Sequence, residues 1–357
     1  MSRGNRVEPD DPLRSNAPRY PGILADTRLT SRRKTVKVLI TGATGFVGSH
    51  LCDYLIQQGN AVSGTYLYAH ELDQFPDYLR SQVELFSCDL TDLAQVRGVL
   101  RAGAFERVYH LAAISSVHKS WEGQDLVIRV NLYGWLNLLE AVQEFCPQAR
   151  VLMVSSGEVY GIVPEAQQPI TESQPLRPIN PYADSKAAQE MFSYQYIHRH
   201  HLPIVIVRPF NHTGPRQAPQ FVCPDFARQI ARIEQGQQAP VMAVGNLDAR
   251  RDFCDVRDVV RAYHLALEQC PIGTPLNIAS GSAWSIKAIL ETLLTLSTVP
   301  IELRQDPQRL RPSDVPLMRG DPSLISRQTG WQAEISFEET LSHVLEYWRE
   351  QVVREDA

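Results

Sequence analysis

A tyrosine and a lysine stand four residues apart in the segment Tyr182-Ala183-Asp184-Ser185-Lys186, which has the character of a helix start. At that spacing the two side chains share one face of a helix. A phenol has an ordinary pKa of about 10, and a fall of that pKa to about 7 requires roughly 4 kcal/mol. One cation about 4 Å away can supply this free energy. We therefore expect Lys186 to lower the pKa of Tyr182, although such pairs are also common on surface helices.

Two further polar side chains, Ser156 and Glu158, follow a largely apolar run at residues 151–155 that predicts a buried strand. A hydroxyl at the end of this strand can reach the substrate oxygen that Tyr182 also touches; the alternative is an exposed serine in a turn. Glu158 could move a substrate proton or bind a substrate hydroxyl. The predicted catalytic residues are Ser156, Glu158, Tyr182 and Lys186.

Upstream, three glycines lie between an apolar strand pattern at residues 36–40 and a helical pattern that begins at Ser49. Strand, glycine turn and helix form the context of a dinucleotide-phosphate site. Gly42 permits the tight turn, Gly45 lets the backbone approach a pyrophosphate, and Gly48 lets the helix pack closely on the strand. The contacts predicted from this turn are Gly42, Thr44, Gly45, Phe46, Val47 and Gly48.

The strand pattern at residues 61–66 ends without the acid that grips the ribose of NAD and without the arginine that accepts the extra phosphate of NADP. It ends in Thr65-Tyr66-Leu67-Tyr68, which leaves the choice between NADP(H) and NAD(H) open. Asp89, after the third strand pattern, could accept from the adenine amino group or cap the next helix. The other predicted cofactor contacts are Thr65, Leu90, Leu111, Ala112, Ala113, Ser115, and again Tyr182 and Lys186.

Six strand patterns alternate with helical patterns up to about residue 207, after which prolines and glycines become frequent. This alternation predicts an α/β fold with a Rossmann-type doubly wound parallel sheet and a smaller mixed α/β lobe. We expect a mobile tail at residues 1–34 and an NAD(P)-binding domain at 35–208, with chain returns near 250–280. Residues 209–350 should form most of a substrate lobe.

Composition excludes several classes of protein. The chain has 357 residues and a formal net charge of -5, so it lacks the basic surface of a nucleic-acid-binding protein. It has no apolar run near the roughly 20 residues of a membrane span. Its six cysteines are scattered without metal-ligand spacing, which suggests reduced thiols in a cytoplasmic protein and no metal.

Together, the glycine turn, Ser156, Tyr182 and Lys186 resemble an extended short-chain dehydrogenase/reductase that acts on a nucleotide sugar. The resemblance covers about residues 36–348. Three later segments, at 208–215, 244–253 and 309–316, resemble the GDP-mannose branch of that family. The resemblance implies a GDP-sugar substrate held by Ser116, Glu158, Asn211, Phe221, Val222, Arg250, Arg311 and Asp314.

Two activities of this branch compete. A GDP-4-dehydro-6-deoxy-D-mannose reductase needs only Tyr182, Lys186 and Ser156, whereas a GDP-mannose 4,6-dehydratase needs an additional proton shuttle, for which Glu158 is in place. The run at 252–260 resembles the reductase, and Gly157 before the acid departs from the Thr-Ser-Glu pattern of the dehydratase. The reductase, forming GDP-D-rhamnose, is our interpretation. A non-catalytic NAD(P)-binding module is a further alternative, which the presence of all three catalytic residues disfavours.

The helical patterns from about residue 124 and from Tyr182 carry apolar residues beyond one face. Extended relatives pair these helices between subunits, so we expect a homodimer, with a tetramer as an alternative. Burial in the core is the competing explanation. The residues concerned are Leu132, Leu136, Met191, Phe192 and Tyr196.

Overall fold

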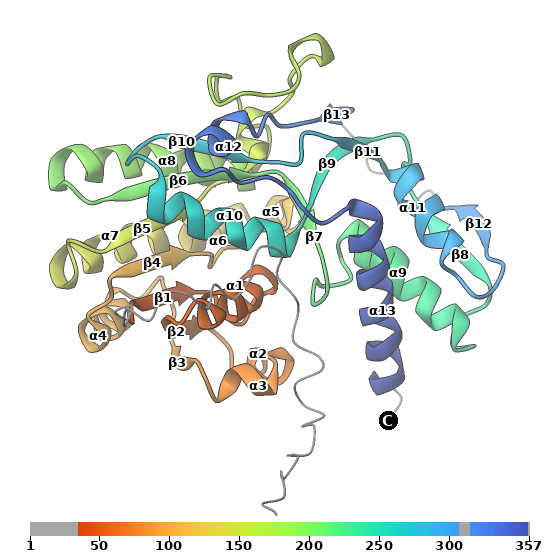
Figure 1. Cartoon of the computed structure of the whole chain (residues 1–357), viewed down its shortest axis with the longest axis horizontal. Helices are drawn as coiled ribbons and strands as arrows, with labels where there is room; N and C mark the ends of the chain where they lie inside the picture. The colour runs from red at the N-terminus through yellow and green to blue at the C-terminus, as the bar shows by residue number, and fades with distance from the viewer. Residues whose placement is uncertain (1–34, 307–314, 356–357) are drawn as a thin grey trace, which may run out of the picture.

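The computed structural model describes residues 35–306 and 315–355. The predicted tail at 1–34 and the predicted substrate contacts Arg311 and Asp314 lie outside the described residues. A seven-stranded parallel sheet dominates the described part, in the order β10-β6-β5-β4-β1-β2-β3 (Figure 1). Its strands are β1 (Lys37–Thr41), β2 (Ala61–Tyr66), β3 (Glu84–Ser87), β4 (Arg107–His110), β5 (Arg150–Val154), β6 (Ile204–Pro209) and β10 (Pro275–Ile278).

Helices cover both faces of this sheet, which is why its central strands are continuous apolar runs. On one face, α1 (Phe46–Gln57) lies beside α10 (Val256–Gln269) (Figure 1). On the other face pack α4 (Leu93–Gly103), α7 (Gly134–Phe145) and α8 (Pro181–His200). The Rossmann-type fold class predicted from the sequence is confirmed.

The loops at the carboxyl ends of the strands carry short elements. After β2 come α2 (Glu71–Gln74) and α3 (Asp77–Arg80), and after β4 come α5 (Val117–Glu122) and α6 (Gln124–Val127). A π-helical turn, Ile128–Tyr133, leads into α7, and the 3-10 turns Gly157–Tyr160 and Glu165–Gln167 follow β5. The carboxyl ends of neighbouring parallel strands share one sheet edge, so these loops gather where ligands bind in such folds.

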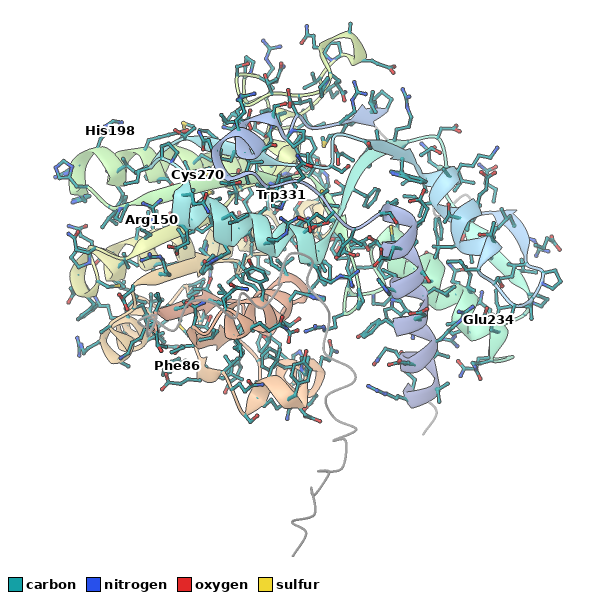
Figure 2. The ribbon with its side chains drawn as sticks, viewed as in Figure 1. Phe86, Arg150, His198, Glu234, Cys270 and Trp331 are labelled. Atoms are coloured by element: carbon teal, nitrogen blue, oxygen red, sulfur yellow. The ribbon has the colours of Figure 1, made fainter. Side chains whose placement is uncertain are left out.

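The chain returns to the sheet after residue 255, and buried polar contacts secure this return. Arg150 at the start of β5 donates to the carbonyl oxygens of Leu267 and Cys270 at the end of α10, at 2.5 and 2.8 Å (Figure 2). Trp331 donates through Nε1 to the carbonyl oxygen of Asp258, at 2.9 Å. β10 then adds itself to the outer edge of β6.

A smaller lobe lies beside the sheet (Figure 1). It contains α9 (Val222–Glu234), α11 (Ile286–Thr295) and α13 (Phe337–Glu355), which share an apolar core, and α12 (Ser323–Thr329) packs back against α10. Strands β11 (Ala283–Ser285), β9 (Arg250–Asp255) and β13 (Leu317–Met318) form one small sheet, with β7 (Asn211–Thr213) also paired to β9. β8 (Val241–Val244) pairs with β12 (Glu302–Gln305).

Within the described ranges, no helix is long and apolar enough to cross a bilayer. The same residues contain no group of three or more side chains placed to hold a metal ion. All six cysteines are described, and each is buried and unpaired.

Candidate active site

The first turns of α8 carry the predicted tyrosine and lysine, and local sequence explains why the helix begins there. The Asn180 side chain accepts from the Ala183 amide at 2.8 Å as an N-cap, and Pro181 occupies the first helical turn. Lys186 Nζ lies 6.0 Å from the centroid of the Tyr182 ring and donates to the Val154 carbonyl oxygen at 2.8 Å. The lysine is thereby tied to the last residue of β5.

Ser156 completes this arrangement. It follows β5, it is buried, and its hydroxyl is near enough to the Tyr182 phenol to act on the pKa of that group. The Ser156 hydroxyl also accepts from the Glu158 amide at 3.2 Å, which orients it at the start of the 3-10 turn. The structure therefore brings Ser156, Tyr182 and Lys186 together at one end of the sheet.

The acid–base state of the tyrosine differs from the sequence-based expectation. Burial raises the pKa of Tyr182 to about 12; the Ser156 hydrogen bond opposes the rise and the Glu158 carboxylate adds to it. Burial also lowers the pKa of Lys186 to about 7, partly offset by the Glu190 carboxylate. The prediction that Lys186 lowers the pKa of Tyr182 is wrong for the protein's own groups, because the lysine is itself desolvated and turned toward Val154. The phenol is held as a proton donor.

Glu158 stands beside this group with two partners that sequence reasoning did not find. Its Oε2 accepts from Asn180 Nδ2 at 3.3 Å, and the positive charge of Arg251 acts on it. Burial raises the pKa of Glu158, while Arg251 and Asn180 oppose the rise. Asn180 thus caps the catalytic helix with one side-chain atom and orients the acid with the other.

Behind the catalytic residues lies a buried ion pair between α8 and β6. Arg208 donates to the Glu190 carboxylate through Nε and a terminal nitrogen, at 2.9 and 2.6 Å, and both side chains are almost fully buried. Ser155 donates to the same carboxylate at 2.5 Å, and Arg208 donates to the Tyr160 hydroxyl at 2.9 Å. This network joins α8, the ends of β5 and β6, and the 3-10 turn at Gly157–Tyr160. It therefore fixes the positions of the catalytic side chains relative to one another.

A second buried polar residue, Asn131, links the loop after β4 to α8. It accepts from the Ile114 amide at 2.8 Å and donates to the Ser185 hydroxyl at 2.9 Å. Gln189 in turn donates to the Asn131 carbonyl oxygen at 2.6 Å. Asn131 sits in the π-helical turn, where the extra residue per turn redirects side chains, and no motif in the sequence marks it.

The glycine turn has the geometry that a diphosphate requires. Gly42 has a φ of 70°, and a Cβ there would lie 3.0 Å from the backbone of Ala112. A Cβ on Gly48 would lie 2.2 Å from the Gly42 carbonyl oxygen, so only glycine lets α1 start this close to β1. The N-cap residue of α1 is Gly45, which has no side chain that could cap the helix amides. The first turn of α1 also has no acidic residue. These features fit a bound dinucleotide.

The other predicted cofactor contacts surround the turn. Thr65 is buried, and its hydroxyl accepts from the Gly42 amide at 3.2 Å. Asp89 accepts from the amide and hydroxyl of Thr91 at 2.8 Å each, while Asp92 caps α4. The remaining predicted cofactor contacts differ in exposure: Leu90 is buried, Ser115 is exposed, and the partly exposed ones are Thr44, Phe46, Val47, Leu111, Ala112 and Ala113. Ser116, a predicted substrate contact, is also partly exposed.

In the lobe, the predicted substrate contacts are spread over several elements. Asn211 on β7 is partly exposed, as are Phe221 and Val222 at the start of α9. Arg250 is exposed and pairs with the exposed Glu165 at 2.6 Å. The next residue, Arg251, is the arginine that acts on Glu158. Arg251 therefore lies within electrostatic reach of Glu158, whereas Arg250 pairs with Glu165 at the surface.

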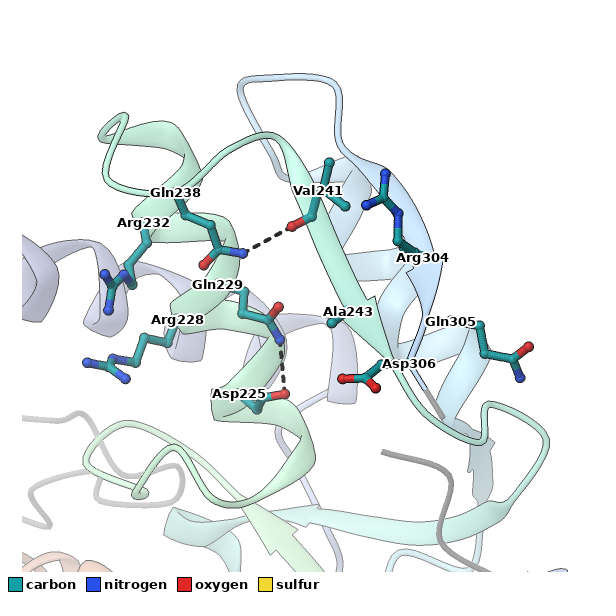
Figure 3. Close-up of a pocket in the computed structure, with 10 residues that line it drawn as sticks. All are labelled: Asp225, Arg228, Gln229, Arg232, Gln238, Val241, Ala243, Arg304, Gln305 and Asp306. Atoms are coloured by element: carbon teal, nitrogen blue, oxygen red, sulfur yellow. Dashed lines mark hydrogen bonds between the residues drawn. The ribbon is translucent and has the colours of Figure 1, made fainter. Parts of the chain in front are cut away.

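An open cavity of about 570 Å³ lies between α9 and the β8–β12 pair (Figure 3). Asp225 and Gln229 face it from α9, Ala243 from β8 and Arg304 from β12. The Gln229 amide donates to Asp225 at 3.0 Å within the cavity wall. The catalytic residues do not line this cavity, which belongs to the lobe.

The sequence matches that of a known family, described as GDP-mannose 4,6 dehydratase, over residues 39–344. The chain belongs to this family. It is 35% identical to a GDP-6-deoxy-D-mannose reductase of Pseudomonas aeruginosa over 90% of this chain and 100% of the relative. It is 28% identical to a GDP-mannose 4,6-dehydratase of Vibrio cholerae, over 87% of this chain and 92% of the relative.

A solved structure extends the similarity to three dimensions. The Pseudomonas aeruginosa protein RMD, complexed with NADPH, superposes with a TM-score of 0.78 at 33% identity, covering 89% of this chain and 100% of that one. The predicted membership of the nucleotide-sugar branch of extended reductases is therefore confirmed. Members of the family matched here include both reductases and dehydratases, so the name of the family alone does not choose the reaction.

Proposed function

We propose that this protein reduces the 4-keto group of GDP-4-dehydro-6-deoxy-D-mannose with NAD(P)H, giving GDP-D-rhamnose. The observation that carries the proposal is the grouping of Ser156, Tyr182 and Lys186 at the end of β5, where burial raises the pKa of the Tyr182 phenol and keeps it a proton donor. Similarity along the whole length of the Pseudomonas aeruginosa reductase supports the same reaction. The bound dinucleotide supplies the hydride.

The protein's own residues account for the proton. As the carbonyl carbon accepts a hydride, negative charge develops on the oxygen, and Tyr182 donates its proton there. Ser156 holds the same oxygen by hydrogen bonding. Lys186 donates to the Val154 carbonyl oxygen and so holds the first turns of α8, which carry Tyr182, against the end of β5. Glu158 binds and orients the sugar, and Arg251 places a positive charge beside it.

A GDP-mannose 4,6-dehydratase is the second candidate, because burial raises the pKa of Glu158 next to Tyr182. A carboxyl group with a raised pKa is suited to moving protons between carbons 5 and 6. We rank it second because Asn180 and Arg251 both stabilise the carboxylate, as a binding role requires.

One experiment separates the candidates. The purified protein is mixed with GDP-mannose or, separately, with GDP-4-dehydro-6-deoxy-D-mannose plus NADH or NADPH, while the absorbance of the reduced nicotinamide is followed. Stoichiometric oxidation with the keto sugar alone supports the reductase. Conversion of GDP-mannose to a keto sugar without net consumption of nicotinamide would refute it in favour of the dehydratase. If neither sugar reacts but the dinucleotides bind, the non-catalytic module is correct.

We also propose a homodimer formed through α8 and the helices before α7. Large apolar side chains are exposed there: Trp121, Leu126, Tyr133 and Met191 are 58, 55, 58 and 53% exposed. Their elements contact one another, so the exposed groups belong to one region. Met191→Asp should shift the mass measured by light scattering toward the monomer. Val353→Asp, at an equally exposed position on α13, is the control and should leave the mass unchanged.

The remaining proposals concern the domain boundaries and the cellular compartment. We assign residues 35–208 with α10 and β10 to the dinucleotide domain and most of 209–350 to the substrate lobe. Six unpaired thiols support a reducing compartment such as the cytoplasm.

A further inference from the structure

The end of β2 is bonded directly to the glycine turn. The Ala43 amide donates to the Thr65 carbonyl oxygen at 2.9 Å, and the Gly42 amide donates to the Thr65 hydroxyl at 3.2 Å. In dinucleotide-binding folds the adenosine ribose lies at this junction, where an acid accepts from the ribose 2′-hydroxyl of NAD or an arginine accepts the 2′-phosphate of NADP. Here the strand ends in Tyr66, whose neutral phenol supplies neither the negative charge of the acid nor the positive charge of the arginine.

An acid nevertheless reaches the junction from the next element. Glu71, the first residue of α2, accepts from the Thr44 hydroxyl through Oε2 at 2.5 Å and from the Tyr68 amide through Oε1 at 3.2 Å. The first of these contacts places the carboxylate against the middle of the glycine turn. The contact to Tyr68 fixes the direction of the side chain.

Among the residues that the structure describes, no lysine or arginine forms an ion pair with this carboxylate. Residues 66–74 contain no lysine or arginine, and Glu71 forms no ion pair within the described part of the chain. Arg80, on the following helix, pairs with Asp77 at 3.6 Å. The only ionisable base in the loop, His70, is exposed and stacks on the Tyr68 ring with centroids 5.5 Å apart.

From this geometry we propose that Glu71 replaces the missing acid at the end of β2 and makes the protein select NAD(H) over NADP(H). Its carboxylate accepts from a ribose hydroxyl of NADH beside Thr44. A 2′-phosphate, carrying about -1.5 to -2 charges at neutral pH, meets a like charge there. The inference rests on the dinucleotide site and is independent of which sugar is reduced.

Such selectivity would distinguish this chain from the Pseudomonas aeruginosa protein, whose structure holds NADPH. The test therefore measures binding without any sugar, by isothermal titration calorimetry of the purified full chain with NADH and with NADPH. We expect the Kd for NADH to be lower by about tenfold or more, since like charges brought together lower affinity strongly. Equal or tighter binding of NADPH by the wild type would overturn the inference.

Variants identify the residue responsible. Glu71→Gln keeps an acceptor for Thr44 and removes the charge, so it should bring the two Kd values within about threefold of each other, mainly through tighter NADPH binding. Glu71→Arg should reverse the preference. Asp73→Asn removes an equal charge from an exposed position two residues on and should leave the ratio as in the wild type.

Two results would count against Glu71 even if the wild type prefers NADH. Equal changes in Glu71→Gln and Asp73→Asn would show a general effect of loop charge. A Kd ratio unchanged in Glu71→Gln, with an unchanged thermal unfolding midpoint, would show that Glu71 only braces the turn. Absence of binding by either dinucleotide would refute the cofactor site itself, whereas failure of the sugar assays leaves this inference intact.

Discussion

Replacing Glu158 by glutamine distinguishes a binding role from a proton-shuttling role. The glutamine retains an oxygen that can accept from Asn180, whose contact in the native protein is long at 3.3 Å, so the fold should persist. What is lost is the charge. A hydrogen bond to a charged group contributes roughly 1.5–3 kcal/mol, and the part that survives in glutamine leaves a loss of about 1–2 kcal/mol. We therefore expect a fall of about 5- to 30-fold in kcat/KM, mostly in KM.

The assay is the reduction of the GDP-linked keto sugar at saturating NADH or NADPH, with kcat and KM determined separately. Glu165→Gln is the matched control, since Glu165 is an exposed carboxylate paired with the exposed Arg250 and such pairs contribute about 0–1 kcal/mol. Positioned acid–base groups typically contribute about 10²- to 10⁴-fold. A fall of about 100-fold or more in kcat with KM unchanged would refute the binding role assigned to Glu158.

Three further perturbations test the site and its frame. Tyr182→Phe should lower kcat by about 10²- to 10⁴-fold with unchanged dinucleotide affinity in calorimetry; retained turnover would exclude Tyr182 as the acid. Arg208→Leu leaves the buried Glu190 carboxylate unpaired and should reduce the free energy of unfolding in urea by about 3–5 kcal/mol, a loss below about 1 kcal/mol being inconsistent with the buried pair. Burial lowers the pKa of Lys186 to about 7 from an ordinary 10.5, so burying the charged lysine reduces the free energy of unfolding. This reduction is absent at pH values above the ordinary pKa and reaches its full size below about pH 7. Lys186→Met should accordingly gain unfolding free energy relative to the wild type as the pH falls from about 10 to 7, and a difference that is constant with pH would contradict the shift.

The parts of the site that could be predicted from sequence are those whose geometry is local. The strand, glycine turn and helix are contiguous, so the roles of Gly42 and Gly48 follow from steric rules that hold for any chain. Tyr182 and Lys186 share a helix turn, and Ser156 directly follows a strand. In each case residues close together in the sequence determine the arrangement, and the sheet as a whole follows from the alternation of such units.

What could not be predicted depends on contacts between distant segments. Asn180 and Arg251 reach Glu158 from different elements, and neither residue type marks a site on its own. The prediction of a lowered pKa for Tyr182 was wrong because the change in this pKa depends on burial and on the orientation of Lys186. Only the packed structure defines both. Glu71 could not be predicted because the acid is expected at the end of the strand, whereas Glu71 lies on the following helix.

The run at 252–260 resembles the reductase in sequence. In the structure, two of its carboxylates form hydrogen bonds that stabilise the fold. Asp252 accepts from the amides of Ser280, Gly281 and Gly320 at 2.8–3.2 Å. Asp258 accepts from the amides of Glu334 and Ile335 at 2.9 Å each. These buried carboxylates join loops from far along the chain. The similarity in this run therefore indicates a shared fold more directly than a shared reaction.

The late return of β10 to the sheet has a consequence for how the chain is made. β6 ends at residue 209, but its edge partner β10 is synthesised only after residues 210–274. Until then the outer edge of β6 exposes unpaired backbone groups, a template for pairing with other chains. Truncation before Pro275 would make that exposure permanent, so fragments that end in the lobe should aggregate rather than yield an independently folded dinucleotide domain.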